Sequence, residues 1–395
     1  MLIQIGNHPY SDRGPVLLQA GFRPFFLLAG LAAALMVPLW LAQVVLGWRA
    51  ALTVPPLLWH GHEMVFGFAT AAVAGFLLTA VPNWTGAATV RGLPLALLAA
   101  LWLAARIGFW AGLPVAVTAV PDLLFLPALG LALARPLIRA GKPRNMMFLG
   151  LLALLDVADA VVLADMAGHG GFGLNGLLAA IFILLFMIAV IGGRIIPGFT
   201  RNGLHMIGVS FEARPRPGLD KAALLTLLAG GLLTVVPLSP PVAGLVLAVA
   251  ALLHAVRLAG WGGRHTARLP LLWILHLGYA WLPLGLGLLA VSDFAPDLLP
   301  MTIALHALTA GTIASMILGV MTRAALGHAG RPLKPHALTV AAYALVQAAA
   351  LARVAGCLID MRLGLMVSGL LWTLAFVLFL VVYAPICLAA RADGR

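Results

Sequence analysis

Long apolar stretches, separated by short polar joints, follow one another along nearly the whole chain. A transmembrane α-helix needs about 20 consecutive apolar residues to cross the hydrocarbon layer. Runs of about this length predict twelve spans, with proline and glycine gathered at the joints. The predicted spans cover residues 23–46, 59–81, 93–111, 113–134, 146–167, 173–196, 220–237, 240–258, 270–291, 299–322, 337–358 and 364–388. The longest connection is then residues 197–219, between spans six and seven.

The composition strengthens this interpretation. Hydrophobic residues make up 63% of the 395 residues and charged residues only 9%, and the mean hydropathy is +1.08. A soluble domain of this length would expose far more charge to water, so the apolar surface must face lipid. We therefore predict an all-α, polytopic membrane protein that forms one integral membrane domain over residues 1–395.

The basic residues predict the orientation in the membrane. The formal net charge is +12, but the lysines and arginines lie in short loops rather than in a basic stripe with aromatic residues, so we expect no nucleic-acid partner. With a cytoplasmic N-terminus, all but four of the 24 lysines and arginines fall on the cytoplasmic side. Such a bias sets topology in membrane proteins. Both termini are therefore predicted to be cytoplasmic. The four exceptions are Arg49, Arg106, Arg353 and Arg362.

The N-terminal residues and the two cysteines supply no further functional candidates. Residues 1–14 are polar, without the apolar core of a signal peptide. The two cysteines, Cys357 and Cys387, belong to no CxxC or haem-attachment motif and are predicted to be packing residues. No phosphate-binding loop, HExxH helix or nucleophile elbow is present, so nothing supports a soluble-type hydrolase.

Span two carries the densest group of ionisable residues, in the segment WHGHEM at 59–64. Residues two apart on a helix point about 200° away from each other, so His60 and His62 are predicted to serve different sides of the span. A strip without bulk, formed by Gly67, Ala71 and Gly75, is expected below His60. Such a strip admits either a neighbouring helix or a flat macrocycle.

Other ionisable groups within spans are functional candidates, because unpaired charge is costly at this depth. Glu63 is either a hydrogen-bond partner that fixes an imidazole tautomer or an interfacial carboxylate facing water. His306 in span ten is expected at the depth of His60 and His62, and His276 in span nine nearer the cytoplasm. Each is either a ligand or a hydrogen-bonded core residue.

Two pairs of charged residues complete these candidates. Arg106 and Asp122 lie in adjacent spans and are predicted to form an ion pair. Asp156 and Asp159, three residues apart, share one face of span five, where they form either a proton path or hydrogen bonds to neighbours. The remaining histidines are expected to be solvated in loops or at span ends: His8, His169, His205, His254, His265, His328 and His336.

Several long motifs, in order, resemble the NnrS family over essentially the whole chain. They are GFRPFF at 21–26, WHGHEMVFGF at 59–68 with GFLLTAVPNWTG at 75–86, GRIIPGFTRNG at 193–203, WILHLGYAWLPLG at 273–285 and HALTAGTIASMILGVMTRAALGHAGRPL at 306–333. One departure is Gly61, where the family most often has alanine; both flanking histidines remain.

The resemblance implies a multi-pass protein of the bacterial inner membrane that contains haem and copper and is associated with denitrification and nitric oxide resistance. By resemblance, haem or copper ligation is expected at four histidines: His60, His62, His276 and His306. The strip of small residues below His60 assigns that residue to haem, with His306 and His276 as further haem candidates, and leaves His62 for copper or a second haem. By the same resemblance, four motif residues have an unknown role: Arg194, Asn202, Arg323 and His328. Positions beside the metal ligands or on a proton path are expected for Glu63, Asp156, Asp159, Arg194, Arg323 and His328.

The functional expectation that follows is a haem protein that binds or reduces nitric oxide, with the lipid bilayer, this small gas and an electron donor of unknown identity as partners. Two alternatives remain. One is a non-catalytic haem or metal sensor or assembly factor, and the other is a proton-coupled transporter that uses Asp156 and Asp159.

Overall fold

The computed structural model describes residues 14–48, 54–88 and 90–394. Within these ranges the regular structure is helical, and twelve helices are long and apolar enough to cross a membrane. Both the fold class and the number of spans are thereby confirmed. Nine of the spans are single α-helices: α1 (Phe22–Val44), α4 (Leu93–Trp110), α5 (Val115–Ala140), α6 (Pro143–Met166), α7 (Gly173–Met206), α8 (Pro217–Val235), α9 (Pro240–Ala259), α10 (Pro270–Phe294) and α15 (Met361–Leu388).

The other three spans contain a π-helical segment, in which hydrogen bonds run from residue i to i+5 and the turn is wider. Span two consists of α2 (Pro56–His62), the π-helix η2 (Glu63–Ala69) and α3 (Thr70–Thr85). Span ten consists of α11 (Met301–His306), η4 (Ala307–Ile313) and α12 (Ala314–His328), and span eleven of α13 (Ala337–Leu351), η5 (Ala352–Gly356) and α14 (Cys357–Ile359). Two short 3₁₀ segments, η1 (Val16–Leu18) and η3 (Gly263–His265), lie outside the spans.

Prolines and glycines set the helix boundaries as the sequence indicated. Proline occupies the first turn of α2, α4, α6, α8, α9 and α10, where its missing N–H is not needed. Gly86 and Gly141 end α3 and α5 in the left-handed conformation, with φ of 73° and 61°.

One predicted connection is wrong. The loop expected at 197–219 is mostly helical, because α7 continues to Met206 and the connection is only residues 207–216. Pro197 lies inside this helix. Leu204 beyond it is fully buried while Arg201 is exposed, so the segment is an amphipathic extension that a search for continuous apolar residues misses.

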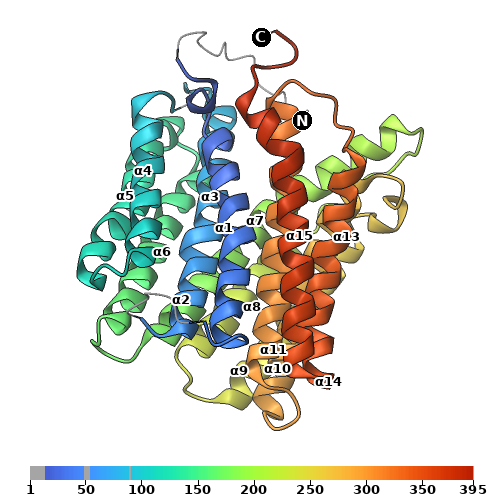
Figure 1. Cartoon of the computed structure of the whole chain (residues 1–395). Helices are drawn as coiled ribbons and strands as arrows, with labels where there is room; N and C mark the ends of the chain where they lie inside the picture. The colour runs from blue at the N-terminus through green and yellow to red at the C-terminus, as the bar shows by residue number, and fades with distance from the viewer. Residues whose placement is uncertain (1–13, 49–53, 89, 395) are drawn as a thin grey trace. The chain divides into compact units, whose positions relative to one another are not determined.

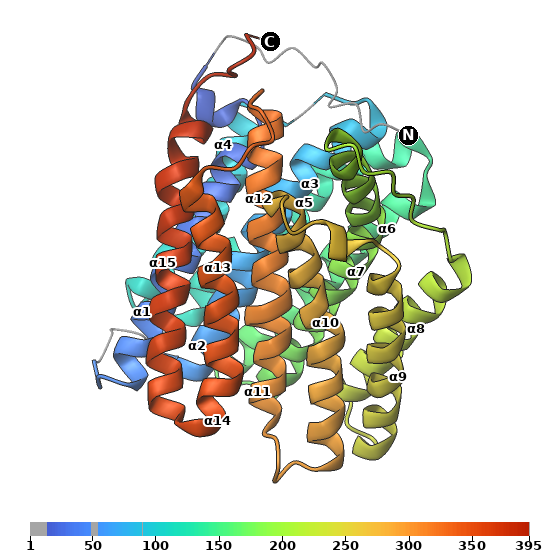
Figure 2. The same ribbon diagram turned by 90° about the vertical axis from the view of Figure 1, so that its right-hand side faces the viewer.

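The chain divides into two compact units, each built from several separate segments. The first comprises Met1–Ala180, Met321–Lys334 and Phe376–Arg395, and the second comprises Ile181–Val320 and Pro335–Ala375. In the first unit α1 packs on α3, and α5 packs between α4 and α6, as Figure 1 shows. In the second unit α9 packs against both α8 and α10, which is clearest in Figure 2. The single domain over residues 1–395 stays a prediction.

Arg23 of the GFRPFF motif joins the two ends of the first unit. Its side chain is fully buried, and Nη1 donates to the carbonyl oxygens of Cys387 and Ala389 at 2.7 and 2.6 Å. These carbonyls lie at the C-terminal end of α15, where helical partners run out and a cation is favoured. Arg23 thus stabilises the end of the last helix. Cys357 and Cys387 are buried free thiols, in agreement with their predicted packing role.

Candidate functional site

The segment WHGHEM forms the last turn of α2 and the start of the π-helix η2. Trp59 is fully buried and its ring meets Trp110 of α4 edge-on, with centroids 5.2 Å apart. The α-helical hydrogen bonding ends at His62, and the wider turn begins at Glu63. π-helical segments inside α-helices are frequent at functional sites, because they re-aim side chains at a cost in backbone geometry.

His62 lies at the centre of a buried polar cluster. Its side chain is fully buried. Nε2 lies 2.9 Å from Asp159 Oδ1 of α6 and 3.3 Å from Asp122 Oδ2 of α5. Nδ1 lies 3.2 Å from Glu63 Oε1. Both ring nitrogens therefore face carboxylate oxygens.

Arg106 of α4 completes this arrangement. Its Nη2 lies 2.5 Å from Asp122 Oδ2 and its Nε 3.1 Å from Glu63 Oε1. The predicted ion pair between Arg106 and Asp122 is thereby confirmed. We call His62, Glu63, Arg106, Asp122 and Asp159 the His62 cluster; all five are buried.

The His62 cluster carries more acid than base. Three carboxylates face one guanidinium and one imidazole, within a region bounded by aromatic rings. The ring centroids of Phe66 and Phe109 lie 5.2 and 5.1 Å from that of His62. Charges removed from water in this way are costly unless each is paired. The cluster therefore requires either protons or a cation to balance it.

Some polar atoms of the cluster lack a hydrogen-bond partner among the residues that the structure describes. They include Glu63 Oε2 and Arg106 Nη1. Gly67 lies beside both atoms, since a Cβ built there would be 3.3 Å from Glu63 Oε2 and 3.5 Å from Arg106 Nη1. The carbonyl of Gly67 accepts a bond from Trp102 Nε1 at 3.0 Å. The sequence left the role of Glu63 open between two alternatives, and its burial against the His62 ring favours the tautomer-fixing one.

His60 points to another helix than His62, as the spacing predicted. Its ring stacks on Trp40 of α1, with centroids 4.2 Å apart and an interplanar angle of 23°. The prediction that Gly67 and Gly75 belong to one strip below His60 is wrong. Gly67 faces Arg106, whereas a Cβ on Gly75 would lie 2.6 Å from the ring of Phe26. The π-helix Glu63–Ala69 lies between the histidines and Gly75, so Gly75 does not have the direction relative to His60 that a regular α-helix would give it. Gly75 therefore provides helix packing.

The position of the ring proton on His306 suits this residue to bind a metal. It is half-buried at the end of α11, directly before the π-helix η4. Its Nδ1 lies 2.6 Å from the carbonyl oxygen of Thr302. A carbonyl only accepts, so Nδ1 carries the proton and Nε2 carries the lone pair. This is the arrangement typical of histidines that bind a metal through Nε2.

His276 lies at a different level of the second unit. Its Nε2 is 2.8 Å from Thr200 Oγ1. A Cβ on Gly278 would touch Met316 and one on Gly285 would touch Leu308, so α10 and span ten run antiparallel. His306 is then about 11 residues, or about 16 Å along the helix axis, beyond His276. Two imidazoles so placed cannot bind one iron, so any metal on His276 belongs to a separate centre.

The surroundings of each histidine determine whether a small metal ion or a haem fits beside it. The ring of His62 is enclosed by carboxylates and by two aromatic rings, which leaves room for a small ion and not for a porphyrin; the prediction of a second haem on His62 does not fit. The lone pair on His306 Nε2 would suit a ligand of haem iron. A haem held by His60 and His306 together stays a prediction.

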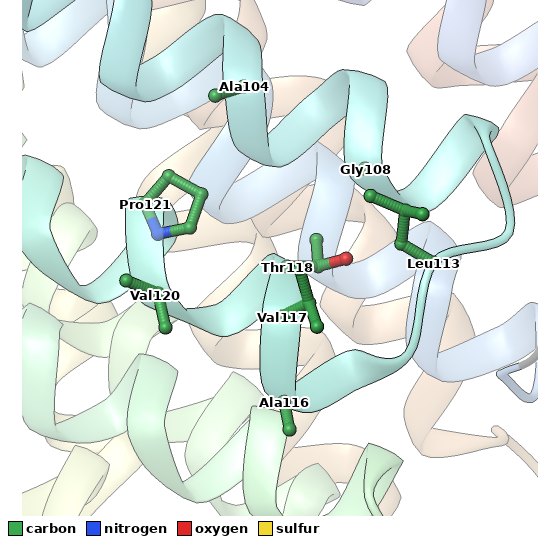
Figure 3. A pocket seen from close by; sticks show the side chains of 8 residues that line it. All are labelled: Ala104, Gly108, Leu113, Ala116, Val117, Thr118, Val120 and Pro121. Atoms are coloured by element: carbon green, nitrogen blue, oxygen red, sulfur yellow. The ribbon is translucent and has the colours of Figure 1, made fainter.

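An apolar pocket of about 540 Å³ lies between α4 and α5. Figure 3 shows the residues that line it, and Gly108 lies close to Thr118, since a Cβ built on Gly108 would be 2.8 Å from Thr118 Oγ1. Gly108 is two residues beyond Arg106, and Thr118 is one helical turn before Asp122. Neither Arg106 nor Asp122 lines the pocket. Its lining is Ala104, Gly108, Leu113, Ala116, Val117, Thr118, Val120 and Pro121.

A second buried polar group was missed at the sequence level. His254 and Arg257 were expected at a solvated span end, but both are buried. Arg257 Nη1 donates to Tyr279 Oη at 2.7 Å and to the Ala189 carbonyl at 2.7 Å, and its Nε donates to Asp220 Oδ1 at 2.6 Å. We call Asp220, His254, Arg257 and Tyr279 the Arg257 network.

Proton positions in the Arg257 network follow from its partners. His254 Nε2 donates to the Ala223 carbonyl at 3.1 Å, so Nδ1 accepts from Tyr279 Oη at 2.8 Å. The GRIIPGFTRNG motif supplies the space: a Cβ on Gly193 would overlap the Arg257 guanidinium. Gly193 was the sequence signal for this network, because a glycine on α7 lets a buried arginine approach the helix backbone closely.

The other predicted site residues lie as follows. Asp156 is half-buried on α6, and its Oδ1 has no hydrogen-bond partner in the described parts of the chain. Arg194 and Arg323 are half-buried and outside the His62 cluster. The half-buried ring of His328 lies 5.9 Å from that of Phe22, so His328 is not the solvated histidine expected at a span end. Asn202 is half-buried on α7.

Twelve apolar spans and charged side chains buried among them define a multi-pass helical membrane protein. The family model described as NnrS protein matches residues 16–391. The chain belongs to the NnrS family, and the resemblance seen in its motifs is confirmed. A search of curated proteins finds no match to it.

Proposed function

We propose that this chain is a haem protein of the bacterial inner membrane that binds or reduces nitric oxide. Membership of the NnrS family supports the assignment. The observation that carries it is His306, whose Nδ1 proton is held by the Thr302 carbonyl at 2.6 Å. That bond orients the ring and makes Nε2 the ligand atom.

When bound, haem iron supplies a site for a diatomic ligand and for electron transfer. The protein residues then have three tasks. His306, with His60 as a second candidate, holds and orients the group. The Phe and Leu side chains of the spans exclude water. Carboxylates within the spans move protons when nitric oxide is reduced, with electrons from a donor of unknown identity.

A spectrum of the purified full chain tests the haem. We expect a Soret band that is lost or strongly shifted in His306→Ala and in His60→Ala. His336→Ala is the matched control, because His336 caps the exposed start of α13. Haem per mole of protein should be unchanged in this control. Absence of a Soret band in protein from haem-replete cells would refute the proposal and favour the transporter alternative.

Consumption of nitric oxide separates the enzyme from the sensor or assembly factor. With an added electron donor, steady consumption supports an enzyme, whereas a single stoichiometric binding event supports a sensor. Gas uptake by the wild type and by His306→Ala, at equal protein concentration, decides between them.

The orientation is part of the same proposal. Reporter fusions after Arg144, Arg216 and Lys334 are expected to report the cytoplasm, and fusions after Gly170 and Asp297 the periplasm. The basis is the asymmetry of lysine and arginine in the loops. Two reversed results would overturn the orientation.

A further inference from the structure

We propose that His62, Asp122 and Asp159 bind a divalent metal cation, with Glu63 and Arg106 orienting two of the three ligands. The site lies wholly within the first unit and does not depend on haem. One donor atom from each of the three residues lies within 4.8 Å of the others, and all three side chains are buried.

The donor distances match a metal polyhedron. First-row divalent ions bind imidazole nitrogen and carboxylate oxygen at about 2.0–2.2 Å. Neighbouring ligands around such an ion are therefore separated by about 2.8–3.6 Å, from the tetrahedral and octahedral angles. The observed separations are 2.9 Å from His62 Nε2 to Asp159 Oδ1 and 3.3 Å to Asp122 Oδ2. An ion can enter with small movements of the side chains.

The residues around the three ligands have the arrangement that metal sites use to orient them. Glu63 Oε1 lies 3.2 Å from His62 Nδ1. A proton on Nδ1 donated to Glu63 leaves the lone pair on Nε2, which faces the two aspartates. Carboxylate, imidazole and metal in this order are a common orienting chain. Arg106 holds Asp122 Oδ2 from the opposite side at 2.5 Å.

The charge of the His62 cluster also favours a divalent ion. With a neutral imidazole, three carboxylates and one guanidinium leave an excess of two negative charges. A divalent cation balances this excess in a buried region, where an imbalance of charge is most costly.

An independent observation comes from Glu63. Its side chain is fully buried, yet Oε2 has no hydrogen-bond partner among the described residues. Unsatisfied buried carboxylate oxygen is rare and costly, and it points to a ligand or water that completes the site.

The donor set selects the class of metal. One imidazole and two carboxylates suit Zn²⁺, Mn²⁺ or Fe²⁺, whereas Cu⁺ prefers thiolate and thioether ligands. The His62 cluster contains no sulfur ligand. The inference is therefore a site for a hard or borderline divalent ion.

Titration of metal-stripped full chain with Zn²⁺ alone, in detergent, is the direct test. The wild type is expected to bind one ion per chain at a saturable site and to gain thermal stability on binding. Asp159→Asn and His62→Gln should weaken binding by about 100-fold or more, and Glu63→Gln by about 10- to 100-fold. Asp156→Asn, on the same helix but outside the cluster, is the matched control and should bind as the wild type does.

Several outcomes would overturn the proposal. A wild type without a saturable site would do so, whatever the variants show. Equal binding by the wild type, Asp159→Asn and His62→Gln would indicate adventitious ions only. If Asp159→Asn does not accumulate, Asp159→Glu keeps the carboxylate and should retain the ion, and its failure to bind would contradict a ligand role for this position. Haem content should be the same in Asp159→Asn and the wild type, so that failure of this site and failure of the haem proposal are distinguishable.

Discussion

The His62 cluster is fully buried and the Arg257 network is buried except for the partly exposed Asp220, and the charged and polar groups of the two are satisfied to different degrees. In the Arg257 network one guanidinium meets one carboxylate, and hydrogen bonds run from Arg257 through Tyr279 and His254 to a backbone carbonyl. In the His62 cluster acids outnumber bases, and Glu63 Oε2 remains without a partner in the described chain.

The difference separates a structural role from a ligand-binding one. A network that closes on itself stabilises helix packing and has no capacity left for a ligand. A cluster that is short of positive charge and leaves buried lone pairs unused retains that capacity. Predictions that break one group and leave the other intact therefore test both interpretations.

The largest effect is expected from Arg106→Met. This change leaves three buried carboxylates without their guanidinium, and breaking a buried pair in this way costs about 3–5 kcal/mol. Thermal unfolding in detergent, or the yield of folded protein, measures the loss. Adding Asp122→Asn removes one of the stranded charges and should recover part of the stability. A double variant no better than Arg106→Met would contradict electrostatic coupling within the cluster.

A somewhat smaller effect is expected from Gly193→Ala. The added methyl group displaces the Arg257 guanidinium from the buried Tyr279 hydroxyl and the Ala189 carbonyl, at a cost of about 2–3 kcal/mol. Gly150→Ala is the matched control, because a Cβ there meets nothing within 4 Å, and alanine favours a helix over glycine by about 1 kcal/mol. The midpoint of thermal unfolding should fall in the first variant only. Bound Zn²⁺ should be equal in both.

Tyr279→Phe removes the hydroxyl that links Arg257 to His254. Both neighbours lose one hydrogen bond in a buried region, so a loss of about 1–2 kcal/mol is expected. The unfolding midpoint measures this loss, and the spectrum and metal content should not change. An altered metal content with unaltered stability would show that the Arg257 network is more than structural.

The smallest effect is expected from Asp156→Asn. The carboxylate is half-buried and one oxygen is unsatisfied among the described residues, so a neutral amide should change stability by no more than about 0.5 kcal/mol. If nitric oxide is reduced, the rate of proton-consuming turnover should fall while haem and metal content stay constant. An unchanged rate would remove Asp156 from the proton path.

Sequence reasoning located the spans because hydrocarbon requires a continuous apolar run, which is visible residue by residue. A search for continuous apolar runs missed the extension of α7, because its buried and exposed residues alternate and therefore resemble a loop. It also missed the burial of Arg257. A basic residue at a span end has the same appearance in sequence whether it reaches water or folds inward onto Tyr279.

For the candidate site, the sequence supplied the ingredients and not their assembly. His62 was a predicted metal ligand, and Arg106 and Asp122 a predicted pair. That Asp159 reaches His62 depends on α6 lying next to α2, which no local pattern encodes. The direction of Gly75 relative to His60 depends on the π turn between them, and no residue type in Glu63–Ala69 predicts one.

The π-helical segment in span two changes the angular relation between the two α-helical halves of the span. Before it, His62 is set at the angle that meets α5 and α6; after it, Gly75 is set at the angle that lets Phe26 of α1 dock. In a regular α-helix these two directions would be locked to each other, so an optimum for one contact would misalign the other. The wider turn makes these two directions independent of each other. Removal of a single residue between Glu63 and Ala69 would therefore disrupt either the contacts of His62 with α5 and α6 or the packing of Gly75 against Phe26.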